Sequence, residues 1–223
     1  MLHIHKEILS FSDMPEIAAH SAKTVLLLRH SYRESLRNGT HDPGLTVEGR
    51  EYALQCGTFL RGMQDICFGS SPRKRAIETI LALIDGAGFK ASEIKLHSII
   101  CDTAQFETPE DLDITLDNGN IPVLLNQYFT TGLADRMIPL PVYHKRLLEF
   151  LTTTTFEKKN TILASHDIVI AALLLPLNVY PFRQDDWCGY VQGAALYQSS
   201  DGDWTIGYIV PDKNSRKKCE LFV

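Results

Sequence analysis

The sequence predicts an α/β protein, built as a three-layer α/β/α sandwich with a mainly parallel central sheet. Short apolar runs of strand length alternate with longer segments whose apolar residues recur at helical spacing. A hairpin signal at Asp201-Gly202 follows the last of these segments. Hydrophobic residues make up 44% and charged residues 22% of the 223 residues, which is enough for the core of one domain.

The first half of the chain contains three predicted strands and two predicted helices. The strands are buried runs at Thr24–Leu28, Ile66–Gly69 and Ile94–Ile100. One helix begins after Thr46, whose hydroxyl suits an N-cap. Another follows Pro72, which suits the first turn of a helix, and ends near Gly86. We also expect a short helix before the first strand.

The second half continues the alternation and ends in the hairpin. Its predicted elements are a helix over Leu140–Thr155, a strand over Thr161–Ala164, a buried helix from Ile168 that stops at Pro176, and strands over Gly193–Ser199 and Trp204–Val210. The stretch from Cys101 to Gly132 is acidic and irregular, and we expect no more than helical fragments there.

Charge and cysteine content exclude several classes of protein. The net charge of −5 argues against nucleic acid as a partner, because binding to phosphate backbones needs a basic face. Five cysteines without a CxxC pair are typical of reduced thiols in the cytoplasm. No signal peptide is evident, and the longest apolar run, Ile168 to Leu177, is too short to cross a bilayer. We expect a soluble cytoplasmic protein, with its oligomeric state open.

Polar side chains follow three of the predicted strands at the point where each strand ends. These clusters are Arg29 to Arg33, Ser70 to Arg75, and Ser165 to Asp167. The ends of parallel strands lie at one edge of a sheet, where open α/β sheets bind their ligands. Guanidinium groups present a planar fork of donors that matches phosphate oxygens, and a helix N-terminus adds partial positive charge. The sequence therefore predicts an anion site that contains histidine.

Four short motifs occur in one order along the chain. They are Leu28–Ser31 (LRHS), Pro43–Gly49 (PGLTVEG), Ser71–Thr79 (SPRKRAIET) and Ser165–Asp167 (SHD). In this order they resemble the RHG, LTxxG, SPLxRAxxT and second-histidine motifs of the histidine phosphatase superfamily. The resemblance implies a phosphoglycerate-mutase-like fold. It covers about residues 24–210, so we expect one domain over residues 1–223 with that core.

The resemblance implies a role for each side chain at these strand ends. His30 is the implied nucleophile that becomes phosphorylated, and Arg29, Arg75 and His166 are implied to bind the phosphoryl oxygens. Arg33 matches the RHxxR form of the acid-phosphatase branch. The same arginines have a physical effect on the nucleophile, because cationic neighbours disfavour a protonated imidazole and only the neutral form attacks.

The proton donor for the leaving group remains open among three carboxyl groups. Asp167 is our first choice, because the acid-phosphatase branch has a His-Asp pair at this place. Its alternative role is an N-cap for the apolar helix that follows. Asp102 and Glu107 come just after the third predicted strand, where the mutase-like branch carries its acid. One carboxyl group can serve as the acid in the first step and the base in the second.

Two positions depart from the motifs, and one rival interpretation involves a metal. Ser31 stands where glycine is commonest and Arg73 where leucine is commonest, and we expect neither side chain to supply essential chemistry. His41-Asp42 and His166-Asp167 contain metal-ligating side chains, but the neighbouring arginines would oppose a divalent cation. We therefore expect no metal and no cofactor.

These observations predict a metal-independent phosphomonoesterase that acts on a small phosphorylated substrate or a phosphoprotein. The interval that houses specificity elements in the family is acidic here and offers few basic groups for a second phosphate, which favours hydrolysis over mutase chemistry. Its acidic residues are Glu107, Glu110, Asp111, Asp113 and Asp117. The alternatives are a catalytically weak phosphate-binding or regulatory protein on the same fold, and a phosphoglycerate-mutase-type phosphotransferase.

Overall fold

The computed structural model describes residues 1–35, 42–90, 93–112, 121–154, 156–183 and 185–213. The strands are β1 (Leu2–Ile4), β2 (Leu9–Ser10), β3 (Lys23–Arg29), β4 (Ile66–Ser70), β5 (Ile94–Leu96), β6 (Asn160–Ser165), β7 (Gly193–Gln198) and β8 (Trp204–Val210). The α-helices are α1 (Met14–His20), α2 (Val47–Thr58), α3 (Lys74–Ala87), α5 (Ile121–Thr131), α6 (Leu140–Thr153) and α7 (Asp167–Leu174). The 3-10 turns are η1 (Phe11–Asp13), η3 (Ser98–Ile100) and η4 (Asp102–Gln105).

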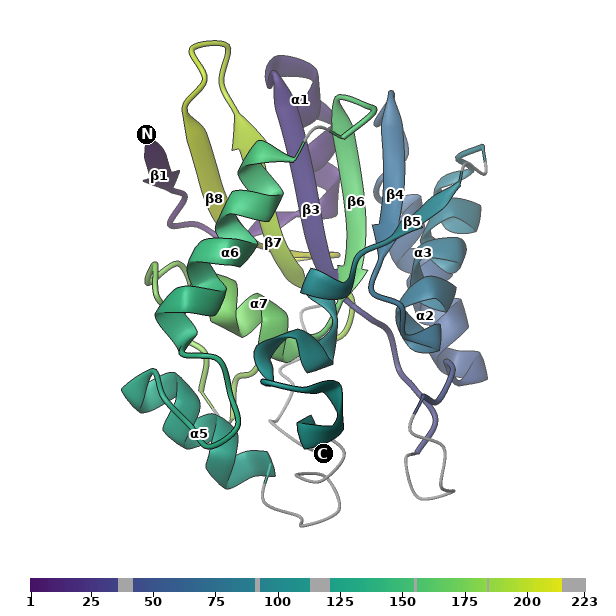
Figure 1. Ribbon diagram of the computed structural model, residues 1–223. Helices are drawn as coiled ribbons and strands as arrows, with labels where there is room; N and C mark the ends of the chain where they lie inside the picture. Colours follow the sequence, from purple (N-terminus) through teal and green to yellow (C-terminus); the bar gives the residue numbers. More distant parts are fainter. Residues whose placement is uncertain (36–41, 91–92, 113–120, 155, 184, 214–223) are drawn as a thin grey trace.

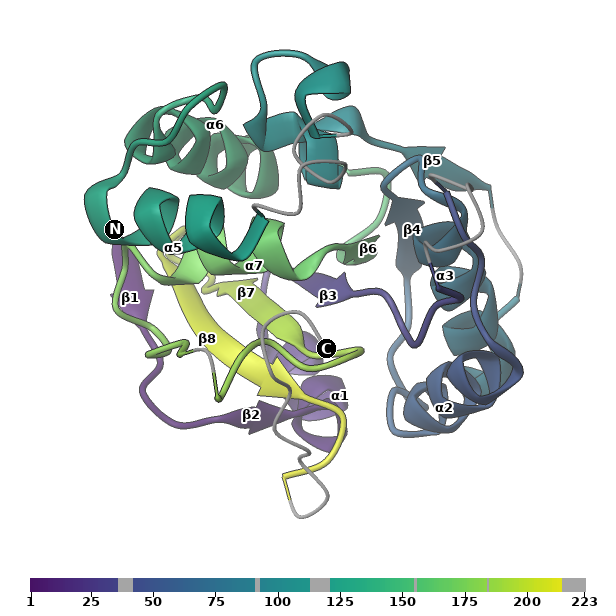
Figure 2. The same ribbon diagram turned by 90° about the horizontal axis from the view of Figure 1, so that it is seen from below.

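The described strands form one eight-stranded sheet between two layers of helices. Their order is β1-β8-β7-β3-β6-β4-β5, and β2 pairs with β8 beside this path. Helices α5, α6 and α7 lie on one face of the sheet, and α1, α2 and α3 lie on the other (Figures 1 and 2). The α/β/α sandwich predicted from the sequence is therefore confirmed.

The sheet is mixed, although most of its strand pairs are parallel. Strand β7 runs antiparallel to both β3 and β8, while β3, β6, β4 and β5 pair in parallel. In the register of the parallel strands, Arg29 lies beside Ser165 and Ser70 lies beside Ala164. The next residues of the three strands, His30, Ser71 and His166, therefore begin their loops at the same edge.

Strand β3 is apolar on both faces because helices cover both faces of the sheet. Val25 and Leu27 pack into the core beneath α6 and α7, whereas Leu26 and Leu28 pack into the core beneath α2 and α3. The side chains of a strand alternate between the two faces, so a continuous run of leucines supplies both cores.

The start of α2 is as predicted, but the start of α3 is not. The backbone N–H of Gly49 donates to the Thr46 hydroxyl at 2.9 Å, so Thr46 is the N-cap of α2. Helix α3 begins at Lys74 with Arg73 as its N-cap residue, so Pro72 precedes the helix instead of lying in its first turn. The Asp42 carboxylate, from a distant loop, accepts the N–H of Lys74 at 3.0 Å. This long-range contact satisfies a backbone N–H of the first helical turn, which has no acceptor within the helix.

Three other predictions differ from the structure. Strands β1 and β2 were not expected; both are short and exist because β8, far along the chain, provides their pairing edge. The predicted strand Ile94–Ile100 is cut to Ile94–Leu96, because a 3-10 turn begins at Ser98. Instead of helical fragments, residues Ile121–Thr131 form a regular helix whose apolar side packs into the core.

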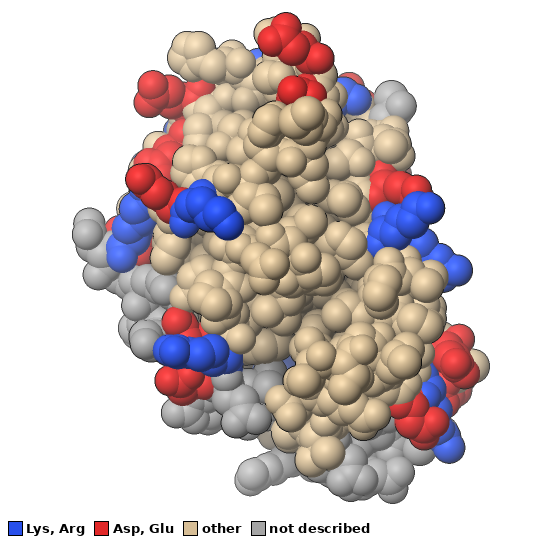
Figure 3. Space-filling view, turned by 90° about the vertical axis from the view of Figure 1, so that its left-hand side faces the viewer, with Lys and Arg blue, Asp and Glu red and all other residues tan. Residues whose placement is uncertain are grey.

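The face that carries α5, α6 and the β1 edge has few charges at its centre. In Figure 3 its Lys and Arg side chains lie near the margins, mostly next to Asp or Glu. Val123 and Val142, on α5 and α6, are 70% and 42% exposed. No helix among the described residues is both long enough and apolar enough to cross a membrane.

Candidate active site

His30 follows directly after β3 and is almost fully buried at the sheet edge. Its backbone N–H donates to the Ser165 carbonyl at 2.9 Å, which ties it to the end of β6. Its ring lies 5.3 Å from the ring of His166, measured between centroids. The two histidines that the sequence predicts, 136 positions apart (166 − 30), therefore form a pair.

Hydrogen bonding and charge define the state of His30. Its Nδ1 lies 2.7 Å from the Ser31 carbonyl, which can only accept, so Nδ1 carries the proton and Nε2 keeps its lone pair. Burial lowers the pKa of His30 well below its usual range, and the nearby charges of Arg75, His166 and Arg29 lower it further. At neutral pH the ring is neutral and nucleophilic at Nε2.

His166 is held between a serine and an arginine. Its Nε2 lies 2.8 Å from the Ser71 hydroxyl, and its Nδ1 lies 3.4 Å from Nη2 of Arg75. A guanidinium only donates, so Nδ1 accepts and Nε2 donates to Ser71. Burial lowers the pKa of His166 to about 3, although Asp102 acts in the opposite direction. His166 is thus neutral at physiological pH as well.

Arg75 projects from the first turn of α3 and is bound by carboxylates. Its Nη2 forms a short ion pair with Asp102, and its Nη1 lies 3.5 Å from Asp42. Its buried Nε has no hydrogen-bond partner among the described residues. A buried N–H donor requires an acceptor from water or a ligand, and a phosphate oxygen is such an acceptor.

Asp102 connects Arg75 to a second arginine, Arg73. Arg73 donates from Nε to Oδ1 of Asp102 at 2.8 Å, although we had discounted this position as a departure from the motif. Burial alone would raise the pKa of Asp102, but His166, Arg75 and Arg73 hold it well below its usual range. The proximity of position 73 to Asp102 is decided by the fold, and the sequence carries no signal for it.

Arg29 and Asp167 form the opposite side of the site. Nη2 of Arg29 lies 3.1 Å from Oδ2 of Asp167, and the indole N–H of Trp187 donates to the same oxygen at 3.2 Å. Arg29 also donates to the Cys188 carbonyl and lies over the ring of Tyr190 at 4.2 Å from its centroid. Asp167 begins α7, with His166 as the N-cap residue, so the predicted N-cap role of Asp167 is not observed.

The other residues that the sequence singles out lie outside this cluster of contacts or outside the described residues. Arg33 is half-buried, and burial lowers the pKa of its guanidinium. The positive charge of Arg75 lowers this pKa further. Glu107 is exposed, and its backbone N–H donates to the carbonyl of Arg136. His41, Asp113 and Asp117 lie outside the described residues.

Residues of the sequence motifs also hold the loop that begins at His30 in place. Thr79 accepts the N–H of Ser31 at 2.9 Å and donates to the Arg75 carbonyl at 2.7 Å. The Ser31 hydroxyl donates to the carbonyl of Gly49 at 2.7 Å. A Cβ on Gly49 would lie 2.1 Å from the carbonyl oxygen of Tyr32, so only glycine fits there. Ser31, from which we expect no essential chemistry, therefore links the His30 loop to α2 and α3.

One group of side chains has the composition of a metal site. Ligand atoms of Cys101, Asp102 and His166 lie within 4.8 Å of one another. The Asp102 carboxylate is already bound by two guanidiniums, and their positive charges oppose a divalent cation at this position. The donor set and its charged surroundings therefore fit an anion site better than a metal site.

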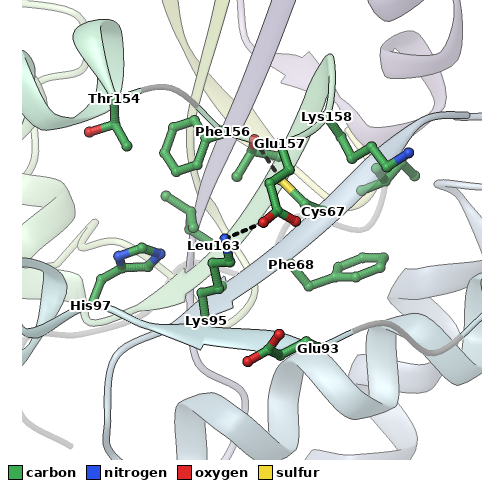
Figure 4. A pocket seen from close by; sticks show the side chains of 13 residues that line it. Cys67, Phe68, Glu93, Lys95, His97, Thr154, Phe156, Glu157, Lys158 and Leu163 are labelled. Carbon is green, nitrogen blue, oxygen red and sulfur yellow. Dashed lines mark hydrogen bonds and ion pairs between the residues drawn. The ribbon is translucent and has the colours of Figure 1, made fainter.

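A cavity of about 220 Å³ lies away from the histidine pair, on strands β4, β5 and β6. Figure 4 shows the ion pair between Lys95 and Glu157, 2.6 Å long, among its lining side chains. Cys67, His97 and Phe156 also line it. None of its lining residues belongs to the predicted site, so we do not assign the chemistry to this cavity.

Comparisons with known proteins agree with the geometry. Residues 25–101 match the family model of the histidine phosphatase superfamily (branch 1). No curated protein matches the chain.

Solved structures with the same fold come from several organisms. The structure of Bacillus stearothermophilus YhfR aligns with a TM-score of 0.60 at 16% identity, covering 84% of this chain and 96% of that one. A phosphoglycerate mutase from Bacillus anthracis aligns with a TM-score of 0.56 at 16% identity, covering 86% and 95%. A phosphoserine phosphatase mutant from Entamoeba histolytica, in complex with phosphoserine, gives 0.53 at 20% identity, covering 85% and 98%. Such identities show a shared fold, and with the family match they confirm the resemblance.

Proposed function

Because this chain carries the motifs and the fold of the histidine phosphatase superfamily, we propose that it is a metal-independent phosphomonoesterase. His30 is the nucleophile, and Arg29, Arg33, Arg75 and His166 bind the phosphoryl group. The substrate is a small phosphorylated molecule or a phosphoprotein, and the enzyme works in the cytoplasm without a cofactor.

The state of His30 is the observation that carries this proposal. A nucleophilic imidazole has to be neutral and needs its attacking nitrogen free. The Ser31 carbonyl takes the Nδ1 proton, and Nε2 has no hydrogen bond within the described part of the chain. Arg29 and Arg75 both lie close enough to lower the pKa of His30. Such an arrangement matches nucleophilic attack on a phosphoryl group.

In the first chemical step, Nε2 of His30 attacks phosphorus and the bond to the ester oxygen breaks. The guanidinium groups stabilise charge on the phosphoryl oxygens, which is the largest expected contribution in phosphoryl transfer. The departing oxygen takes a proton from a carboxylic acid. Neutral His166 binds a phosphoryl oxygen when its Nε2–H turns from the Ser71 hydroxyl, to which it donates here, to that oxygen.

In the second step, water attacks the phosphorus of phosphohistidine. The carboxylate that gave up its proton accepts one from this water, and the phosphorus–nitrogen bond breaks. The products are inorganic phosphate and free His30, so the enzyme returns to its starting state with no net change in protons on the protein.

We assign the carboxyl group to Asp167 and treat Asp102 as its competitor. Asp102 bridges Arg73 and Arg75, and its lowered pKa opposes protonation at neutral pH. Asp167 pairs with Arg29 at the other side of the site. The resemblance to the mutase-like branch favours Asp102 instead, because that branch carries its acid just after the third predicted strand.

Comparison of Asp167→Asn with Asp102→Asn decides between these carboxylates. The measurement is the ratio of turnover rates for ethyl phosphate and 4-nitrophenyl phosphate. An alkoxide is a poor leaving group and needs an acid, whereas nitrophenolate leaves without one. We expect the ratio to fall for Asp167→Asn. A fall only in Asp102→Asn would transfer the role to Asp102.

The proposed activity itself is tested with 4-nitrophenyl phosphate in the presence of a chelator. We expect turnover that resists the chelator and falls by several powers of ten in His30→Ala. His20→Ala is the control, because His20 is exposed on α1. Loss of turnover on chelation would indicate a metal, and phosphate binding without turnover of any phosphomonoester would indicate a binding protein.

A further inference from the structure

Arg73, Asp102 and Arg75 form a bridge at the edge of the phosphate site. The two oxygens of Asp102 are divided between the arginines: Oδ1 accepts from Arg73 Nε at 2.8 Å, and Oδ2 forms the short pair with Arg75. The side chains are 18%, 13% and 7% exposed, so water screens the bridge only weakly. One carboxylate therefore serves two guanidiniums.

Asp102 and a bound phosphate would compete for the same donors. Arg75 is an implied phosphate ligand, yet its Nη2 is bound to Asp102. A carboxylate bound to Arg75 alone would neutralise that cation and repel a phosphate dianion. With Arg73 on its other oxygen, the carboxylate has a second cation to pair with, and the bridge as a whole keeps one positive charge.

The other charged groups near this bridge do not replace Arg73. Asp42 also approaches Arg75, at 3.5 Å, but both of its oxygens accept the backbone N–H of Lys74 at the start of α3. His166 lies 3.9 Å from Oδ2 of Asp102, and its lowered pKa leaves it uncharged at neutral pH. Lys74 is directed to Glu78, at 4.0 Å. Arg73 is thus the cation placed to hold Asp102 when phosphate arrives.

We propose that Arg73 is a positioning residue that holds the Asp102 carboxylate when phosphate displaces it from Arg75, and so makes Arg75 available for phosphate. The proposal rests on the phosphate pocket of the proposed function, but it does not depend on turnover. The proposal also explains why arginine stands at a position where leucine is commonest in the family. Without Arg73, the Asp102 carboxylate would pair with Arg75 and compete with phosphate for its guanidinium.

The test is the affinity for inorganic phosphate, measured by calorimetry on the full chain and on three variants. Arg73→Leu leaves Arg75 as the one guanidinium of the described residues that binds Asp102, so we expect phosphate to bind about tenfold more weakly. Asp102→Asn removes the competitor and should bind phosphate at least as tightly as the unmodified protein. The double variant Arg73→Leu, Asp102→Asn should regain affinity relative to Arg73→Leu. A purely structural role for Arg73 would not produce that recovery.

Two further variants keep the result interpretable. Arg73→Lys retains the charge but loses the fork, so its phosphate affinity should lie between those of the unmodified protein and Arg73→Leu. Lys74→Leu, at the next residue, is the matched control and should change the affinity less than Arg73→Leu. Thermal unfolding of each variant shows whether it is folded.

The outcomes separate this inference from the proposed activity. Unchanged phosphate affinity in folded Arg73→Leu overturns the inference, as does a double variant that binds no better than Arg73→Leu. If phosphate does not bind the unmodified protein, the inference is also overturned. Absence of turnover with the expected pattern of phosphate affinities overturns the proposed phosphatase activity and leaves the role of Arg73 standing.

Discussion

Replacing Thr79 with valine tests whether α3 fixes the loop that begins at His30. Thr79 and Ser31 are both fully buried, and the hydroxyl accepts the Ser31 N–H at 2.9 Å. Valine has nearly the same shape but no acceptor, so this N–H loses its partner inside the core. An unpaired buried donor costs about 1–3 kcal/mol, and we expect the free energy of unfolding to fall by about 2 kcal/mol.

Urea denaturation of Thr79→Val and of a matched control measures this effect. Thr153→Val is the control, because the Thr153 hydroxyl makes the same kind of bond within its helix, to the Glu149 carbonyl, but at the surface. For a chain of this size, about 2 kcal/mol corresponds to a fall in Tm of about 4–8 °C. Equal losses of stability in the two variants would refute the reasoning, because the bond to Ser31 would then contribute nothing.

Three further predictions follow from the same geometry. The pKa of His166 is about 3 in the folded protein, against about 6.5 when unfolded, so the folded state binds fewer protons between these values. The free energy of unfolding should therefore fall as the pH drops below about 6.5, by up to about 1.4 kcal/mol per pH unit for this histidine, and an equally steep fall in His166→Gln would contradict this. Gly49→Ala should lose about 1–3 kcal/mol of stability in thermal unfolding, because its Cβ would meet the backbone of Tyr32 at 2.1 Å; full stability would mean that α2 can shift. Arg75→Lys should lower kcat/KM by about tenfold through loss of the guanidinium fork, and an unchanged value would place Arg75 outside the phosphate pocket.

Local sequence patterns predicted those helices, strands and turns whose conformation is set by residues adjacent in the sequence. The leucine run of β3, the Thr46 cap and the Asp201-Gly202 hairpin are local patterns, and each appears in the structure where it was expected. Strands β1 and β2 were missed for a physical reason. A strand of two or three residues has no intrinsic preference strong enough to detect, and its existence depends on an edge provided by β8.

The candidate site likewise has features that the sequence predicts and features that depend on tertiary contacts. Parallel strand ends place His30 and His166 together, and the sequence predicts this pair because the rule for strand ends is general. The structural contacts of Ser31 and Arg73 could not be predicted from the sequence, because both depend on partners brought near by α2, α3 and η4. Neither partner is close in sequence, so the residue types alone carry no signal.

The sequence by itself determined the α/β class, the order of the main strands and helices, and the placement of histidines and arginines at strand ends. These properties follow from periodicity and local turn chemistry, which act over a few residues. Only the tertiary structure decided which carboxylate meets which arginine: Asp167 lies against Arg29, while Asp102 bridges Arg73 and Arg75. Ion pairs depend on distance in space, and side chains on separate loops acquire that distance only when the chain has folded.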